Sequence, residues 1–196
     1  MGLDPEAVRG YLRAAAAGPT ADAQGKAYEA LAVHLFEAIP GCFAERDIIS
    51  FFGAEQIDIA VGNPRLSDGL PLLPPVLLVE CKDWARPVDS KTVGYFINIL
   101  ANRSVETGIL IAANGITGDP EELSRAHALG ISAVARGIKL LIMTTAEIQN
   151  LTCTADLTRL LNRRYLRAIT SGGLGTPHSA SSSTPPATSS PPTAAT

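Results

Sequence analysis

Three charged residues stand inside apolar stretches that have the pattern of buried strands. Asp58 interrupts the alternating run at 57–61. Glu80 and Lys82 end the most hydrophobic run in the chain, residues 76–82. A lone charge in such a place is costly unless it is paired or bound to a metal. These three side chains are therefore candidates for chemistry.

Strand geometry would bring the three groups together. Glu80 and Lys82 are two residues apart, so on a strand they project from the same face with Cα atoms about 6.6 Å apart. If the strand of Asp58 is the antiparallel neighbour, its carboxylate meets that of Glu80 across the pair. Two carboxylates and a backbone carbonyl form an oxygen site of the kind that Mg²⁺ prefers. A lysine beside it can orient or help deprotonate a water on the metal and balance negative charge on a phosphate, and Glu29 is placed to add a further contact.

The elements that must position these residues alternate along the chain. Periodicity and breaker residues predict helices over 5–17, 21–38, 90–104 and 119–129, and one or two helices over 145–166. They predict strands over 43–52, 56–61, 76–82, 108–114 and 138–144. This order predicts an α/β sandwich with a mixed central sheet flanked by helices, in which early strands meander and later strands are joined by helical crossovers.

Composition divides the 196-residue chain into a charged part and an uncharged end. Residues 171–196 contain 24 Ser, Thr, Pro, Ala or Gly residues out of 26 and no charge, so all 16 basic and 19 acidic residues precede them. This excludes a highly basic DNA-coating protein and a second globular domain at the C-terminus. We expect an N-terminal helical extension over 1–20, one globular domain over 21–168 and a disordered tail over 169–196.

The sequence also indicates a compartment. Its apolar runs are too short to span a bilayer and its first residues lack a signal-peptide core, so no membrane association is expected. The cysteines at 42, 81 and 153 are widely spaced and form neither a disulfide framework nor a zinc knuckle. A reducing, cytoplasmic location is the expectation.

The chain resembles the PD-(D/E)xK nuclease superfamily, and more closely its Mrr-like branch of restriction endonucleases. The stretches that carry the likeness are GKAYE (25–29), EQID (55–58), VECKDW (79–84), GILIAANGIT (108–117) and ARGIKLLIMT (135–144). The likeness covers roughly residues 22–162. It implies a restriction-endonuclease-like α/β/α sandwich and identifies 21–168 as a nuclease domain.

The resemblance also implies roles for single residues. Asp58 and Glu80 would bind the divalent metal with the main-chain carbonyl of Cys81, Lys82 would be catalytic, and Glu29 would complete the catalytic set. Mg²⁺ is the expected cofactor and Mn²⁺ the expected substitute. Hydrolysis of DNA would leave a 5′-phosphate.

Further basic residues are candidates for DNA contacts: Lys91, Arg163 and Arg164. Several family members carry a Q-x-x-x-Y pattern on the helix after the E-x-K strand, and here Lys91 takes the place of the glutamine, with Tyr95 in register. The arginines equally suit the C-terminal turn of a helix, where the dipole favours positive charge. The sequence contains no separate DNA-reading domain, so we expect a homodimer or a partner protein that supplies recognition.

Three functional hypotheses remain open at this level. The first is a metal-dependent DNA endonuclease that acts in defence against foreign or modified DNA, as type IV restriction enzymes do, or in DNA repair. The second is a catalytically silent nuclease-like module that binds nucleic acid or protein, and the third is an assembly protein tethered by its tail. An E-x-K tripeptide alone arises by chance about once in a chain of this size. The intact set of Asp58, Glu80 and Lys82 favours the nuclease.

Overall fold

The computed structural model describes residues 2–49, 56–82, 85–117 and 119–176. Within these ranges the chain forms helices and strands in the order α1 (Pro5–Ala17), α2 (Ala21–Glu37), β1 (Phe43–Ile49), β2 (Gln56–Gly62), β3 (Val76–Lys82), α3 (Ser90–Asn102), β4 (Thr107–Ala112), α4 (Pro120–Ala135), β5 (Lys139–Met143), α5 (Thr145–Gln149) and α6 (Thr154–Ser171).

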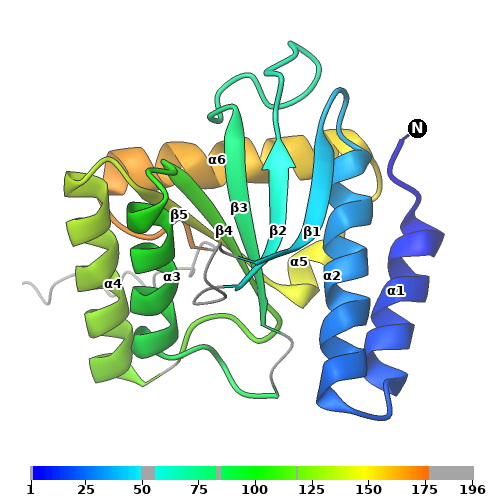
Figure 1. The fold of residues 1–196 in the computed structure, drawn as a ribbon, viewed down its shortest axis with the longest axis horizontal. Coiled ribbons are helices and arrows are strands. Elements are labelled where there is room, and N and C mark those ends of the chain that lie inside the picture. Colours follow the sequence, from blue (N-terminus) through cyan, green and yellow to red (C-terminus); the bar gives the residue numbers. More distant parts are fainter. Residues whose placement is uncertain (1, 50–55, 83–84, 118, 177–196) are drawn as a thin grey trace, which may run out of the picture.

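The strands form one mixed sheet in the order β1-β2-β3-β4-β5 (Figure 1). β1, β2 and β3 are antiparallel neighbours, as a meander requires. β3, β4 and β5 are parallel, and α3 and α4 make the crossovers between them. The expected α/β sandwich with a mixed central sheet is confirmed.

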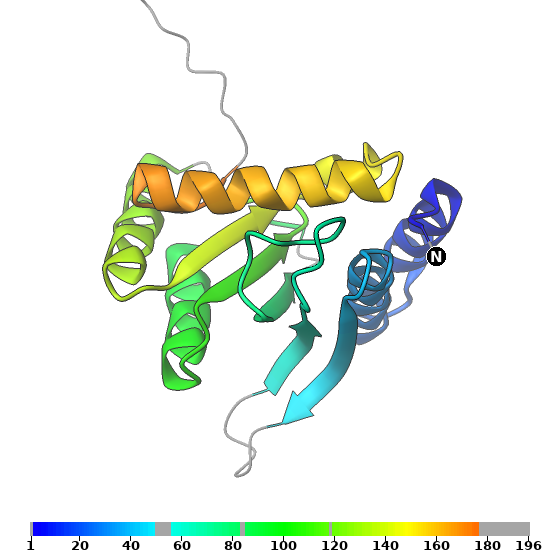
Figure 2. The same cartoon turned by 90° about the horizontal axis from the view of Figure 1, so that it is seen from above.

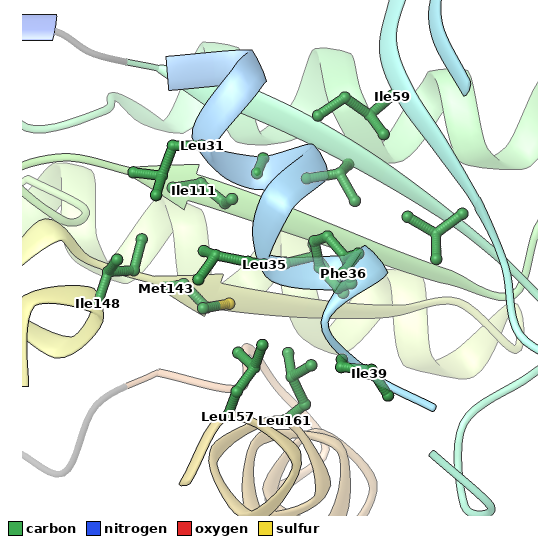
Figure 3. Close-up of a cluster of buried hydrophobic side chains, with 14 of the residues drawn as sticks. Leu31, Leu35, Phe36, Ile39, Ile59, Ile111, Met143, Ile148, Leu157 and Leu161 are labelled. Atoms are coloured by element: carbon green, nitrogen blue, oxygen red, sulfur yellow. The ribbon is translucent and has the colours of Figure 1, made fainter. Parts of the chain in front are cut away.

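Helices cover both faces of the sheet (Figure 2). The core on one face, here called the α2-side core, joins α2, α5 and α6 to the sheet and includes Leu31, Phe36 and Leu157 (Figure 3). The core on the other face, here called the α3-side core, joins α3 and α4 to the sheet and includes Phe96 and Ala126. Helix α1 packs on α2 and α5. The sheet is thus fixed from both sides, which gives the residues at its strand ends a rigid support.

Short polar side chains set where the main helices begin. Asp4, Thr20, Asp89 and Asp119 each accept a hydrogen bond from a backbone N–H in the first turn of the helix that follows. Such caps satisfy amide groups that have no partner within the helix. The caps at Asp89 and Asp119 place the starts of α3 and α4 shortly after the ends of β3 and β4.

Two boundaries differ from the sequence-based expectation. Helix α4 continues to Ala135 instead of ending near 129, because Ala126, Gly130 and Ala133 keep a small buried face against the sheet. The expected tail is ordered over 169–176: α6 runs to Ser171, Leu174 is 4% exposed, and 175 pairs with Leu141 of β5. The prediction of disorder from 169 is therefore wrong for these residues, because one buried leucine and strand pairing hold them.

Some predictions fall on residues outside the described ranges, namely 50–52 of the first strand and 177–196 of the tail. Among the helices that the structure does describe, none is both long and apolar enough to cross a membrane.

Candidate active site

The sheet opens between β2 and β3 at Asp58. The last ladder pair between these strands is Ile59 with Val79, whereas β3 continues to pair with β4 as far as Lys82. Beyond the last β2–β3 pair, the Asp58 carboxylate replaces a backbone acceptor: the Cys81 N–H donates to Asp58 Oδ2 at 2.8 Å. This place, where β2 and β3 separate at Asp58, is here called the fork. It fixes Asp58 against β3, the strand that carries Glu80 and Lys82.

Glu80 and Lys82 form an ion pair at this fork. Lys82 Nζ lies 2.5 Å from Glu80 Oε1, and the side chains are 22% and 8% exposed, respectively. Their shared face is what the two-residue spacing predicts. The other oxygen, Glu80 Oε2, is buried and has no hydrogen-bond partner among the described residues. Such an oxygen is unusual, because buried polar atoms in proteins are generally paired.

Glu29 approaches the fork from helix α2, which packs on β1, β2 and β3. Its Oε2 is also buried without a partner in the described part of the chain. Burial raises the pKa of Glu29, and the nearby carboxylates of Asp58 and Asp47 raise it further. The structure therefore brings Glu29 together with Asp58, as the sequence analysis expected.

The carboxylates repel one another in a desolvated setting. Burial raises the pKa of Asp58 although the Cys81 N–H and the Lys82 charge oppose the shift. Burial raises the pKa of Glu80 too, with the charge of Asp58 as the next cause. Burial by itself would lower the pKa of Lys82, but the charge and hydrogen bond of Glu80, together with the charge of Asp58, outweigh it and the pKa is raised. Asp58 and Glu80 share the single ammonium of Lys82, so this pair favours an additional cation.

The donor set fits a divalent cation of the hard, oxygen-binding kind. Within the described residues, no group of three or more His, Cys, Asp or Glu side chains is arranged to hold a metal ion, so a cation here would depend on fewer than three such side chains. Asp58 and Glu80 supply carboxylates, and the unpartnered Oε2 atoms of Glu80 and Glu29 are acceptors that a cation and a water, respectively, would satisfy. The thiol of Cys81 is no candidate ligand, because burial raises its pKa well above the ordinary value. Oxygen donors with places left for water suit Mg²⁺.

Of the three residues expected to contact DNA, two are exposed and one is buried. Lys91 is exposed in the first turn of α3, and Arg163 is exposed on α6, a helix that packs on β5, two strands from β3. The expectation for Arg164 is wrong. Its side chain is 5% exposed and donates to a carboxylate oxygen of Glu147 and to the carbonyl of Thr176, so it holds the fold.

Three charged neighbours of Glu29 were missed by the sequence analysis. Asp47 raises the pKa of Glu29, whereas Arg46 and Lys26 lower it. Arg46 Nη2 lies 4.0 Å from Asp47 Oδ2 on β1. The signal that could have found Arg46 and Asp47 is the run of three charges at 45–47 in the expected strand. Lys26 lies on α2, within the stretch 25–29 that also contains Glu29.

Comparison with known proteins gives a family match. The family model Mrr_cat, described as a restriction endonuclease, matches residues 20–143. The matched segment contains Glu29, Asp58, Glu80 and Lys82, and it ends before α5 and α6. A search of curated proteins finds no significant match.

Proposed function

Because the chain belongs to the Mrr_cat restriction endonuclease family, we propose that it is a metal-dependent endonuclease that hydrolyses phosphodiester bonds of DNA. One observation supports the metal site above all others: two carboxylate oxygens, one on Glu80 and one on Glu29, are buried around Asp58 without a partner in the described chain. A structural ion pair would have no use for unfilled oxygens at a strand end. A cation bound by Glu80 and a water held by Glu29 would explain the two oxygens.

Each residue of the fork has a task in this proposal. Asp58 and Glu80 hold Mg²⁺ together with the main-chain carbonyl of Cys81, and Mn²⁺ substitutes for it. When bound, Mg²⁺ supplies a Lewis acid that polarises the scissile phosphate. The ammonium of Lys82 stabilises negative charge that develops on the phosphate, since a fixed cation in a desolvated site acts strongly. Glu29 orients water at the site through its unfilled oxygen.

The reaction balances as a hydrolysis. Water attacks phosphorus, the bond from phosphorus to the 3′ oxygen breaks, and the products carry a 3′-hydroxyl and a 5′-phosphate. A duplex cut needs two such sites, so a homodimer, or a partner protein that supplies recognition, completes the enzyme. The substrate is foreign or modified DNA, which would place the protein in defence, or damaged DNA in repair.

A plasmid assay tests the proposal. Supercoiled and linear plasmids, methylated and unmethylated, are incubated with the protein and Mg²⁺ or EDTA, beside Lys82→Ala and Asp58→Ala. Lys139→Ala is the matched control for the lysine, because Lys139 begins β5 and donates to the carbonyl of residue 137, away from the fork. We expect Mg²⁺-dependent cleavage by wild type and the control, with none by the two site variants.

Two other outcomes are informative. Cleavage that survives both site substitutions contradicts the assignment of Asp58 and Lys82. Retained DNA binding without cleavage of any substrate by wild type contradicts the enzyme and supports the silent nuclease-like module.

A further inference from the structure

Asp47 has a backbone conformation that is unusual inside a strand. Its φ is +55°, and among the described residues only Arg65 and Ser104 are other non-glycine residues with positive φ. Both of those lie outside strands, whereas Asp47 is in the middle of β1. The left-handed region is unfavourable for L-amino acids, and Asp and Asn tolerate it better than alanine or β-branched residues do. Position 47 therefore favours residues that tolerate a positive φ.

Asp47 lies directly across from the candidate metal ligand Asp58. The ladder between β1 and β2 pairs Arg46 with Ile59 and Ile48 with Ile57. Asp47 and Asp58 occupy the position between these two pairs. The irregular backbone is thus at the level of the fork and not elsewhere along the strand.

Along both β1 and β2, the side chains change from one face of the sheet to the other at this level. On β2, Ile59 and Val61 pack in the α2-side core, but Ile57 packs in the α3-side core. In a regular strand, residues two apart share a face, so the backbone must rotate between 57 and 59. The partner strand does the same: Ala44 packs against the α2-side core and Ile48 against the α3-side core.

The rotation explains how Asp58 reaches β3. At this point the Cys81 N–H is taken by the Asp58 side chain, and β2 stops pairing with β3. Without the rotation, Ile57 and Ile59 would face the same core. The rotation also coincides with the end of the β2–β3 ladder, whose last pair is Ile59 with Val79.

We propose that Asp47 is a positioning residue: its left-handed backbone lets the β1–β2 ribbon rotate and so places the Asp58 carboxylate on the Cys81 N–H, in the geometry that the metal site requires. This rests on the proposed nuclease function for its consequence in catalysis, but the placement of Asp58 can be measured without any cleavage. In this proposal the conformation of Asp47 places the Asp58 carboxylate, whereas the negative charge of Asp47 acts only on the pKa of Glu29 and of Asp58.

The test separates conformation from charge. Asp47→Asn and Asp47→Gly keep a residue that tolerates positive φ but remove the charge, whereas Asp47→Val opposes the conformation. Asp47→Ala is a milder version, in case the valine variant does not fold by circular dichroism. Glu45→Val is the matched control, because it also replaces an exposed acid of β1 by valine, at a position outside the left-handed region.

The primary readout is hydrogen exchange of the Cys81 amide, followed by NMR, with Asp58→Ala as the reference for a lost bond. We expect exchange at least about tenfold faster in Asp47→Val and intermediate in Asp47→Ala, with the Asn, Gly and Glu45 variants within about threefold of wild type. Mg²⁺-dependent cleavage should be lower in Asp47→Val than in Asp47→Asn, since both variants lack the Asp47 charge that raises the pKa of Glu29 and differ in the backbone conformation they tolerate.

Clear results would overturn the proposal. If Asp47→Val and Asp47→Ala leave the Cys81 amide protected, the conformation does not position Asp58. If the Cys81 amide in Asp47→Asn loses as much protection as in Asp47→Val, the charge places Asp58 and the conformational account is wrong. If the amide responds as expected but no variant or wild type cleaves DNA, the positioning role stands and the nuclease function fails.

Discussion

Glu80 and Glu147 are two little-exposed carboxylates that each lie beside a basic partner, and the structure uses them differently. Glu147 offers Oε1 to Arg164 and Oε2 to the backbone N–H and the hydroxyl of Thr144, both at 3.1 Å. Glu80 offers Oε1 to Lys82, but its Oε2 is buried without a partner in the described residues. The first carboxylate is saturated and fixes α5 to α6. The second carboxylate, that of Glu80, has one buried oxygen without a hydrogen-bond partner in the described residues.

The difference teaches how to separate a structural ion pair from a binding site. Burial and a short contact are common to both pairs. The pairs differ in the second carboxylate oxygen: that of Glu147 accepts from Thr144, whereas that of Glu80 is buried without a partner in the described residues, which costs stability. The saturated pair also lies beyond the family match, and the unsaturated one within it.

The largest expected effect comes from the same substitution in both places. Glu80→Gln should lower Mg²⁺-dependent cleavage by roughly 10²- to 10³-fold, because it removes a metal ligand and a fixed charge at the reaction centre. Glu147→Gln should leave cleavage per folded molecule unchanged. Initial rates on supercoiled plasmid measure this, and equal losses in both variants would break the distinction between the two pairs.

Arg164 should matter for folding as Glu80 matters for activity. Arg164→Met leaves the Glu147 carboxylate without its partner, so we expect the free energy of unfolding to fall by about 3 kcal/mol. Arg163→Met, at an exposed neighbouring position, should change it by less than about 0.5 kcal/mol. Urea unfolding monitored by circular dichroism compares the two, and an undiminished stability of Arg164→Met would refute the structural role.

Removing the charge of Glu29 and removing that of Glu147 should change the free energy of unfolding in opposite directions. Glu29→Gln removes a partly buried charge that faces Asp58 and Asp47, so in EDTA it should stabilise the protein by about 0.5 kcal/mol while it slows cleavage. Glu147→Gln should destabilise by about 1 kcal/mol, because it weakens a satisfied charged hydrogen bond. Opposite signs in urea unfolding support the comparison, and a shared sign contradicts it.

The smallest expected effect is a pH dependence at Asp58. Burial raises the pKa of Asp58 above that of an unfolded aspartate. Its stabilising contribution is thus complete below the unfolded pKa and is lost as the pH rises through the folded one. In EDTA, Asp58→Asn, which still accepts the Cys81 N–H bond, should match wild type near pH 4 and exceed it at pH 7.

Unfolding measured at a series of pH values tests this, and Mg²⁺ should reduce the advantage of the variant at pH 7, because the cation stabilises only the wild-type site. An advantage that is constant with pH would show that ionisation of Asp58 has no cost in the fold.

Much of this arrangement follows from local sequence patterns, and the rest depends on tertiary packing. The two-residue spacing of Glu80 and Lys82 is enough to place both on one face of β3. The alternation at 57–61 predicts a strand but not its rotation, because alternation alone puts Ile57 and Ile59 on the same face. That rotation depends on the conformation of Asp47, which no periodicity reveals.

The closing helix shows the same limit. Arg163 and Arg164 are adjacent members of a basic cluster, and only the packing of α6 on α5 buries one and exposes the other. Composition likewise assigned 169–176 to a disordered tail, although the buried Leu174 and the pairing of residue 175 with β5 attach this segment to the core.

The most direct test of the central claim is the binding of Mn²⁺, followed by electron paramagnetic resonance, to wild type, Glu80→Gln and Glu147→Gln. Wild type and Glu147→Gln should bind the ion alike, and Glu80→Gln should lose the binding, because Glu80 is a proposed metal ligand and Glu147 is not. Equal binding by all three proteins would contradict the claim that the vacant oxygen of Glu80 marks the metal site.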